Sequence, residues 1–238
     1  DLVAFFQTPL ADRAAILYRQ AVFRDLGVAA NAAVLTAFAR AMRTMREQRE
    51  QAGKLYYAQQ KQGWLLHAAE TYCSAVEALR AGLVPLALSC AGLVAFRAFV
   101  DDYADSAGFR LLCTRVRRLT ADLATIRYNV LIGDGGLRVC LYDNEADYSA
   151  EVGETFQKFR QGAAQDYRVR FHETKEMNHI EAKIVEVVAL LQPEIFGRLA
   201  RFAAEADGFA DRTLLRFDRE VQFYFAYLDH MAALCRAG

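Results

Sequence analysis

The chain has 238 residues, 54% of them hydrophobic, which is enough for a sizeable core in one large domain or two small ones. Lysine and arginine together number 29, as do aspartate and glutamate, so no net charge draws the whole chain to nucleic acid or to an acidic membrane. Any contact with nucleic acid is therefore expected to be local.

The composition also favours helices over a turn-rich β architecture. The chain has three prolines and many alanine, leucine, arginine and glutamate residues, which favour long helices. We predict a mainly α fold: a helical core bundle with long lever helices and a small β-hairpin insertion. The five cysteines include no CxxC pair, which favours free thiols of a cytoplasmic protein over disulfides or a zinc site. Pro85 and polar residues interrupt the apolar run from Leu83 to Val100, so we interpret it as a core helix rather than a membrane span.

Apolar residues spaced three and four apart predict the first two helices. Thr8 followed by Pro9 is typical of a helix start, and this helix should end at Gly27. A second helix is expected from about Asn31.

The second helix carries a basic stripe. Its members are Arg40, Arg43, Arg46 and Arg49. Glu47 and Glu50 stand four residues after two of these arginines, so we expect a solvated face that pairs with itself rather than a phosphate-binding stripe.

Three more helices are predicted before the pattern changes. The first two are Trp64–Arg80 and Leu88–Tyr103, which Gly82 and Pro85 separate. The third has an apolar seam from Phe109 to Leu123.

The following segment reads as a β-hairpin. The runs Thr125–Ile132 and Leu137–Tyr142 are β-branched and aromatic, and the turn sequence Gly133–Gly136 joins them. After the hairpin we expect a helix over Ser149–Phe159, whereas Gly162–Thr174 has no clear period.

The remainder is predicted to be helical. One helix spans Ile180 to Leu191, another starts at Pro193, and no glycine or proline interrupts the last one between Phe209 and Ala237. The last helix carries one apolar seam of Leu214, Phe217, Val221, Tyr224, Leu228, Met231 and Cys235. Because the chain begins with Asp1 and stops at Gly238 straight after this helix, we expect it to be a piece of a longer protein.

Two stretches near the ends of the chain carry the most specific motifs. Pro9–Asp12 (PLAD) precedes an amphipathic stretch with Ile16, Arg19, Val22 and Leu26, and Leu228–Leu234 reads LDHMAAL. The first resembles the start of the core-and-lever region of MutS-family DNA mismatch-repair ATPases. The second resembles the helix by which that region returns to the ATPase domain.

Further segments extend this resemblance. The segment from Glu176 to Leu191 resembles the family's descending lever helix, and Tyr148–Glu151 with Thr155–Arg160 resembles a divergent bacterial branch that lacks a mismatch-reading domain. Phe171–Glu173 matches the letters of the mismatch-reading motif, but we interpret it as a chance match because it lies in mid-chain. Gly133–Gly136 lacks the lysine and the following helix of a phosphate-binding loop, so no ATP site is expected in this segment.

The resemblance implies a mechanical role for a non-catalytic segment. It implies a helical core (1–108), an ascending lever helix (109–124), a β-hairpin or clamp-like insertion (125–174), and a descending lever helix with a return to the core (175–238). It also implies that ATP and magnesium bind in a missing domain, that the full-length protein is a cytoplasmic homodimer, and that it binds double-stranded DNA and no membrane. We expect no catalytic, cofactor-binding or metal-binding residue here. The seam residues expected to transmit movement are Leu119, Ile184, Leu191, Val221 and Leu228.

Four basic residues nearest the expected clamp tip are the candidates for contact with DNA phosphates. They are Lys158, Arg160, Arg168 and Arg170. The alternative is that they form structural salt bridges with Glu151, Glu154 and Asp166.

Two other functions stay open. Asp101, Asp102 and Asp105 fit the DDxxD motif of terpenoid synthases, whose carboxylates bind magnesium and a substrate diphosphate. Asn178 and Glu186 partly match the second metal motif of those enzymes, but the ligand between them is replaced by Ala182. In the alternative, purely structural interpretation, the three aspartates are solvated or part of a turn at a helix end. The other function is a stand-alone helical dimerisation module.

Overall fold

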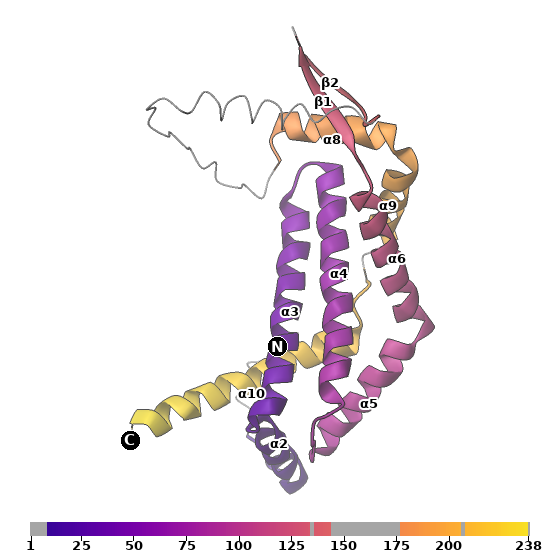
Figure 1. Ribbon diagram of the computed structural model, residues 1–238. Helices are drawn as coiled ribbons and strands as arrows, with labels where there is room; N and C mark the ends of the chain where they lie inside the picture. The colour runs from indigo at the N-terminus through magenta and orange to yellow at the C-terminus, as the bar shows by residue number, and fades with distance from the viewer. Residues whose placement is uncertain (1–8, 134–135, 144–176, 206–207, 238) are drawn as a thin grey trace, which may run out of the picture. The chain divides into compact units, whose positions relative to one another are not determined.

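The computed structural model describes residues 9–133, 136–143, 177–205 and 208–237, and it confirms the prediction of a mainly α fold (Figure 1). These residues form eight helices and one two-stranded sheet. The chain divides into two compact units. We call Asp1–Ala124 with Gly197–Gly238 the bundle, and Thr125–Phe196 the hairpin unit.

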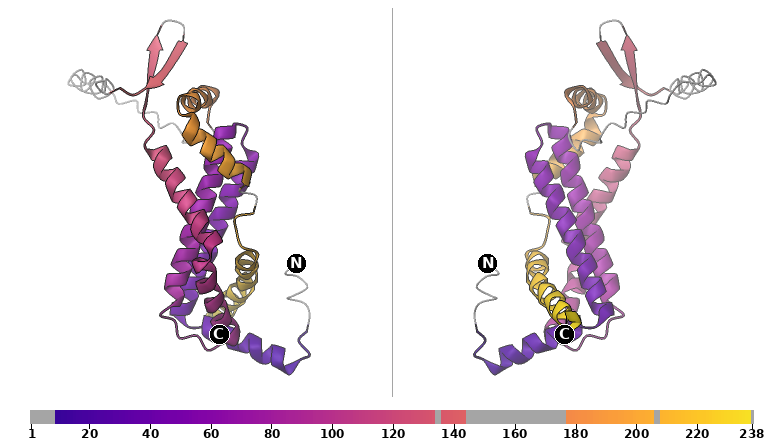
Figure 2. Two further views of the ribbon diagram at one scale, coloured as in Figure 1. Left: turned by 90° about the vertical axis from the view of Figure 1, so that its right-hand side faces the viewer. Right: turned by 90° about the vertical axis from the view of Figure 1, so that its left-hand side faces the viewer.

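A long antiparallel helix pair forms the centre of the bundle. It consists of α3 (Ala29–Lys54) and α4 (Ala58–Leu83), each of 26 residues, which corresponds to a length of about 39 Å. Three residues connect the two helices, which therefore run side by side along their whole length (Figures 1 and 2). Leu35, Met42 and Met45 of α3 are fully buried, as expected from their spacing of seven and three.

Helix α2 (Arg13–Leu26) precedes this pair and meets α3 at an angle of 93°. The Asp12 carboxylate caps α2 by accepting hydrogen bonds from the amides of Ala14 and Ala15 at 3.3 and 3.1 Å. The predicted start at Thr8 and Pro9 is therefore wrong for Pro9, which lies outside the helix, while Thr8 lies outside the described residues.

Helices α5 (Ala91–Asp105) and α6 (Ala107–Ala124) complete one side of the bundle. The break between them depends on Ser106, which ends α5 and whose Oγ accepts a hydrogen bond from the Phe109 amide at 3.2 Å. The expected helix end near Asp105 is thus confirmed. Buried Phe109, Cys113, Val116 and Leu119 form the inner face of α6, as the spacing predicts.

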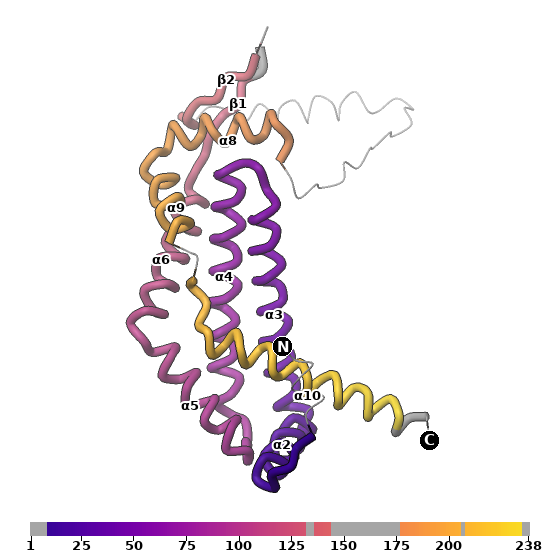
Figure 3. The backbone as a smooth tube through the Cα atoms, turned by 180° about the vertical axis from the view of Figure 1, so that it is seen from behind, coloured from indigo at the N-terminus to yellow at the C-terminus, as the bar shows by residue number. Residues whose placement is uncertain are grey.

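The last helix closes the bundle from the other side. Helix α9 (Pro193–Glu205) leads to α10 (Arg212–Ala237), which is capped by the Asp211 carboxylate and crosses α3 (Figure 3). The start of α10 is fixed by the buried Tyr72 hydroxyl, which accepts a hydrogen bond from the Asp211 amide at 2.9 Å and lies 2.8 Å from the Tyr103 hydroxyl. This network joins α4, α5 and α10.

The hairpin unit contains the predicted β-hairpin. Strand β1 (Tyr128–Gly133) pairs with β2 (Gly136–Leu141) in antiparallel register, with Val130 opposite Val139. Helix α8 (His179–Leu191) contacts β2. The helix predicted over 149–159 and the segment 162–174 lie outside the described residues.

The arginine stripe on α3 differs from its prediction. Glu50 pairs with Lys54 at 2.6 Å, not with Arg46, and Arg46 instead donates to Asp218 of α10. Arg49 lies over the Phe209 ring at 5.5 Å. A face that was expected to pair with itself in solvent therefore serves partly as a contact surface for α10 and the residues before it, because α10 crosses α3 there.

Four cysteines of the described residues have free thiols, and Cys73, Cys90 and Cys113 are buried.

No single helix in the described ranges has the length and apolar character needed to cross a membrane, although the bent pair of α2 and α3 meets those two criteria together.

Asp25, near the end of α2, is a buried acid that binds several groups of another helix. Its carboxylate accepts hydrogen bonds from the Ser89 amide at 2.9 Å, the Ser89 hydroxyl at 2.6 Å and the Cys90 amide at 2.8 Å. It thereby caps the N-terminus of α5 from another helix. Burial alone would raise the pKa of Asp25, but these hydrogen bonds and nearby Arg24 lower it.

We predict that Asp25→Ala lowers the free energy of unfolding by about 2–4 kcal/mol, because it leaves buried amide donors without an acceptor. Urea denaturation measures this loss, and Asp12→Ala, which removes an exposed cap, serves as the control with a smaller loss. Equal stability of the two alanine variants would contradict this role.

A second prediction concerns pH. Because the folded pKa of Asp25 is lowered, wild type should be more stable than Asp25→Asn above about pH 4, and this difference should disappear as the pH falls further.

Candidate functional site: the junction of α2 and α10

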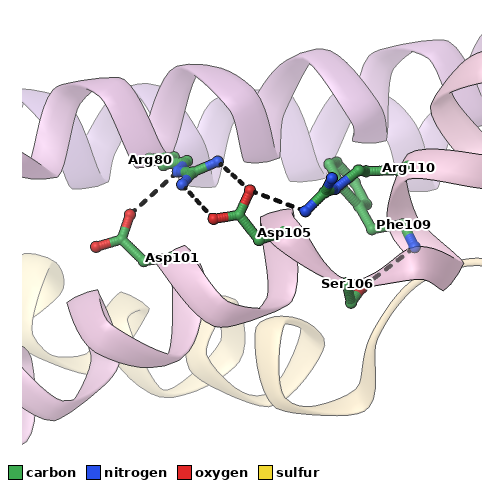
Figure 4. A network of polar contacts seen from close by, with 6 residues as sticks. All are labelled: Arg80, Asp101, Asp105, Ser106, Phe109 and Arg110. Carbon is green, nitrogen blue, oxygen red and sulfur yellow. Dashed lines mark hydrogen bonds and ion pairs between the residues drawn. The ribbon is translucent and has the colours of Figure 1, made fainter.

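The acidic motif at the end of α5 is bound to arginine (Figure 4). Arg80 donates from Nε to Asp101 Oδ1 at 3.1 Å, and from both terminal nitrogens to the two Asp105 oxygens at 3.1 and 2.7 Å. Arg110 approaches Asp105 from α6 at 3.5 Å. The hydrogen bonds from Arg80 lower the pKa of Asp105. Asp101 and Asp105 are therefore not simply solvated: they are partners of a guanidinium that joins α4 to α5.

This arrangement is unlike a magnesium site. A positive guanidinium already lies between two of the carboxylates and offsets part of their charge. No group of three or more histidine, cysteine, aspartate or glutamate side chains within the described ranges is placed to hold a metal ion.

The residues of the partial second metal motif have structural partners as well. Asn178 caps α8 by accepting from the amides of Ile180 and Glu181, both at 2.9 Å. Glu186 pairs with Lys183 at 2.8 Å. Both contacts are local to α8, so neither requires a ligand.

The proposed DNA contacts are not among the residues that the structure describes. Lys158, Arg160, Arg168 and Arg170 lie outside them, as do Glu151, Glu154 and Asp166, their alternative partners. Phe171–Glu173 also lies outside.

Helix α2, which follows the Pro9–Asp12 motif, packs on α10 just before its Leu228–Leu234 motif. Phe23 of α2 packs against three aromatic rings of α10, with centroid distances of 6.0 Å to Phe223, 4.9 Å to Tyr224 and 4.9 Å to Tyr227. Arg19 lies over the Phe223 ring at 5.8 Å. Segments about 200 residues apart in sequence therefore share one aromatic contact surface.

A pocket of about 490 Å³ lies beside this contact, between α2, α5 and α10. Its walls include Leu26, Phe96, Phe217 and Tyr224, and Phe96 stacks on Phe217 with a centroid distance of 3.6 Å. Arg216 and Glu220 pair with each other at 2.7 Å on its lining. The rest of the lining is mostly apolar and suits apolar packing.

The seam of α10 is buried over only part of its length. Leu214 and Val221 are buried, whereas Met231 is 38% exposed, and Tyr227 and Leu234 beside the seam are 45% and 54% exposed. The C-terminal part of α10 projects past α3 (Figures 1 and 3). The bundle thus holds the first half of α10 and leaves an apolar face on the second.

The seam residues named from the sequence differ in burial. Leu119 and Val221 are buried in the bundle, and Leu228 is half-buried there. Ile184 and Leu191 are half-buried in the hairpin unit.

The sequence interpretation missed two buried acids, Asp25 and Asp218. The burial of Asp218 could have been predicted from its spacing. It stands four residues after Leu214 and three before Val221, so it lies on the apolar seam of α10. A charged residue at such a position requires a partner.

Comparison of the chain with protein-family models, with curated proteins and with solved structures gives no match. The resemblance to the MutS family therefore depends only on the residues of this chain.

We predict that titration of the chain with magnesium and a prenyl diphosphate gives no binding heat at micromolar concentrations, because Arg80 occupies the two carboxylates. Isothermal calorimetry measures this, and a terpenoid synthase titrated in the same way provides the positive control. Micromolar affinity for the pair of ligands would restore the synthase interpretation.

For the junction, we predict that Phe23→Ala lowers the free energy of unfolding by about 2–4 kcal/mol, since it removes a ring from three aromatic contacts. Tyr56→Ala is the matched control, because Tyr56 is 89% exposed and its loss should change stability by less than about 0.5 kcal/mol. Chemical denaturation measures the free energy of unfolding of both variants. Similar losses in the two would show that the contact between α2 and α10 contributes little to stability.

Proposed function

We propose that the chain is the non-catalytic core-and-lever region of a MutS-like DNA mismatch-repair protein. Its role is to couple an ATPase domain elsewhere in the full-length protein to DNA binding. ATP and magnesium would bind in that domain, and the full-length protein would act as a homodimer on double-stranded DNA.

The observation that supports this proposal most is the packing of α2 on α10. The stretches that resemble the family lie near opposite ends of the sequence, Pro9–Asp12 just before α2 and Leu228–Leu234 within α10, and a core region that opens with one and returns with the other brings these two helices together. Phe23 meets three rings of α10, with two centroid distances of 4.9 Å.

A mechanical role also agrees with the packing around α10. Its first half contacts α2 through Phe23 and α3 through Arg46, and the preceding Asp211 binds Tyr72 of α4. Close-packed helices move as units rather than deforming continuously. A displacement of α10 would therefore act on three helices at once.

One observation favours the alternative of a stand-alone dimerisation module. The exposed apolar side chains Tyr227, Met231 and Leu234 on α10 are the kind of surface that a second helix covers. The reading frame that encodes the chain separates the two functions. A phosphate loop ending in Gly-Lys-Ser or Gly-Lys-Thr within about the next hundred codons supports the MutS-like role, and its absence contradicts it.

The DNA contacts have their own test. We predict that the affinity of the chain for duplex DNA falls with salt, and that replacing Lys158, Arg160, Arg168 and Arg170 by glutamine lowers the slope of log K against log salt by about 3–4. Each lost phosphate contact accounts for about 0.9 of that slope.

The control replaces four exposed arginines of the bundle, Arg13, Arg40, Arg212 and Arg219, by glutamine. It removes the same charge, so its slope should stay near that of wild type. Equal slopes for the two variants, or no binding at low salt, would reject the proposed contacts.

A further inference from the structure

Helix α10 buries one charged side chain where it crosses α3. Asp218 is 2% exposed and lies on the seam between Leu214 and Val221, which are 0% and 3% exposed. An apolar residue would fill such a position without any desolvation cost. The presence of a carboxylate there needs a physical reason.

The carboxylate has one strong partner. Arg46 of α3 donates from Nη1 to Asp218 Oδ2, and its side chain is 47% exposed, so it reaches into the seam from the surface. Asp218 Oδ1 is buried and has no hydrogen-bond partner within the described residues. Gln222 and Arg43 are close enough to favour the charged form.

The energetic balance of this pair is unfavourable for the ionised form. Burial raises the pKa of Asp218 above its usual value, although Arg46, Gln222 and Arg43 all act in the opposite direction. Because the folded pKa is raised, the stability of the fold falls as the pH rises through the range in which Asp218 ionises. The ionisation of Asp218 therefore costs stability at neutral pH.

The same pair is demanding in geometry. Arg46 reaches one point on the face of α10, and a shift of α10 by one helical turn, about 5.4 Å, would leave the carboxylate buried without its guanidinium. The apolar and aromatic contacts of the seam distinguish less strongly between alternative positions of α10 on α3, because Phe and Leu side chains repack at modest cost. Buried polar groups serve as register-fixing devices in other helical assemblies.

We propose that the Arg46–Asp218 pair fixes the position of α10 on α3 and does so at the expense of stability. The inference goes beyond the proposed function and does not depend on it, because it concerns only the bundle and needs neither DNA nor ATP.

The test compares Asp218→Leu with wild type at pH 7. The melting temperature should rise by about 2–4 °C, because an apolar side chain of similar size replaces a buried ion pair. At the same time, the methyl NMR resonances of Leu214 and Val221 should split from one set into several, as α10 takes up more than one register.

Three further variants complete the design. Asp218→Asn keeps the size of the side chain and should raise the melting temperature without a full apolar replacement. Arg46→Gln should lower the melting temperature, since it leaves a buried charge without its partner. Asp229→Leu makes the same substitution at an exposed position of α10 and should keep one set of resonances.

A single set of resonances in Asp218→Leu would overturn the proposal at any melting temperature. A lower melting temperature in both Asp218 variants, or failure of Asp218→Leu to fold, would also overturn it, since Asp218 would then be an ordinary stabilising contact.

Discussion

The bundle depends on the burial of the first half of α10. Helices α3 and α4 bury their seams on each other, α2 packs on α3 and α5, and Phe217, Val221 and Tyr224 of α10 line the pocket beside α2 and α5. Such burial is the main favourable term in folding, at roughly 25 cal/mol per Å² of apolar surface. The contact between α2 and α10 links the ends of the sequence, so the bundle folds as one unit whose parts are far apart in the chain.

Two buried aspartates, one on α2 and one on α10, affect the stability of the bundle in opposite ways. Asp25 accepts three hydrogen bonds at the start of α5, which lower its pKa, so its ionised form stabilises the fold. Asp218 has Arg46 as its strong partner and one oxygen without a hydrogen bond from the part of the chain that the structure describes, and burial raises its pKa. A buried carboxylate is therefore stabilising or costly according to how many donors surround it. The acids at the surface of α5 act through Arg80 and join α4 to α5.

Periodicity was enough to predict the regular elements. The seam of α6, the hairpin and the long final helix all lie where the sequence predicts them, because apolar period and turn residues are local properties, although β1 begins at Tyr128 rather than Thr125. Caps and partners were harder to predict. Asp12 rather than Pro9 caps the start of α2, and Arg46 pairs with Asp218 rather than with Glu50. The partner of Arg46 depends on which groups tertiary packing brings together. Asp25 and Ser89 are 64 residues apart, so no local pattern connects them.

If the chain is the core-and-lever region proposed above, α2 and α10 should move as one unit when nucleotide binds. Hydrogen–deuterium exchange of the intact gene product that contains this chain, with and without a non-hydrolysable ATP analogue, tests this most directly. We expect the amides of α2 and α10 to change their protection together when the analogue binds, because Phe23 joins the two helices. Unchanged protection in both helices, or a change confined to one, would contradict the account.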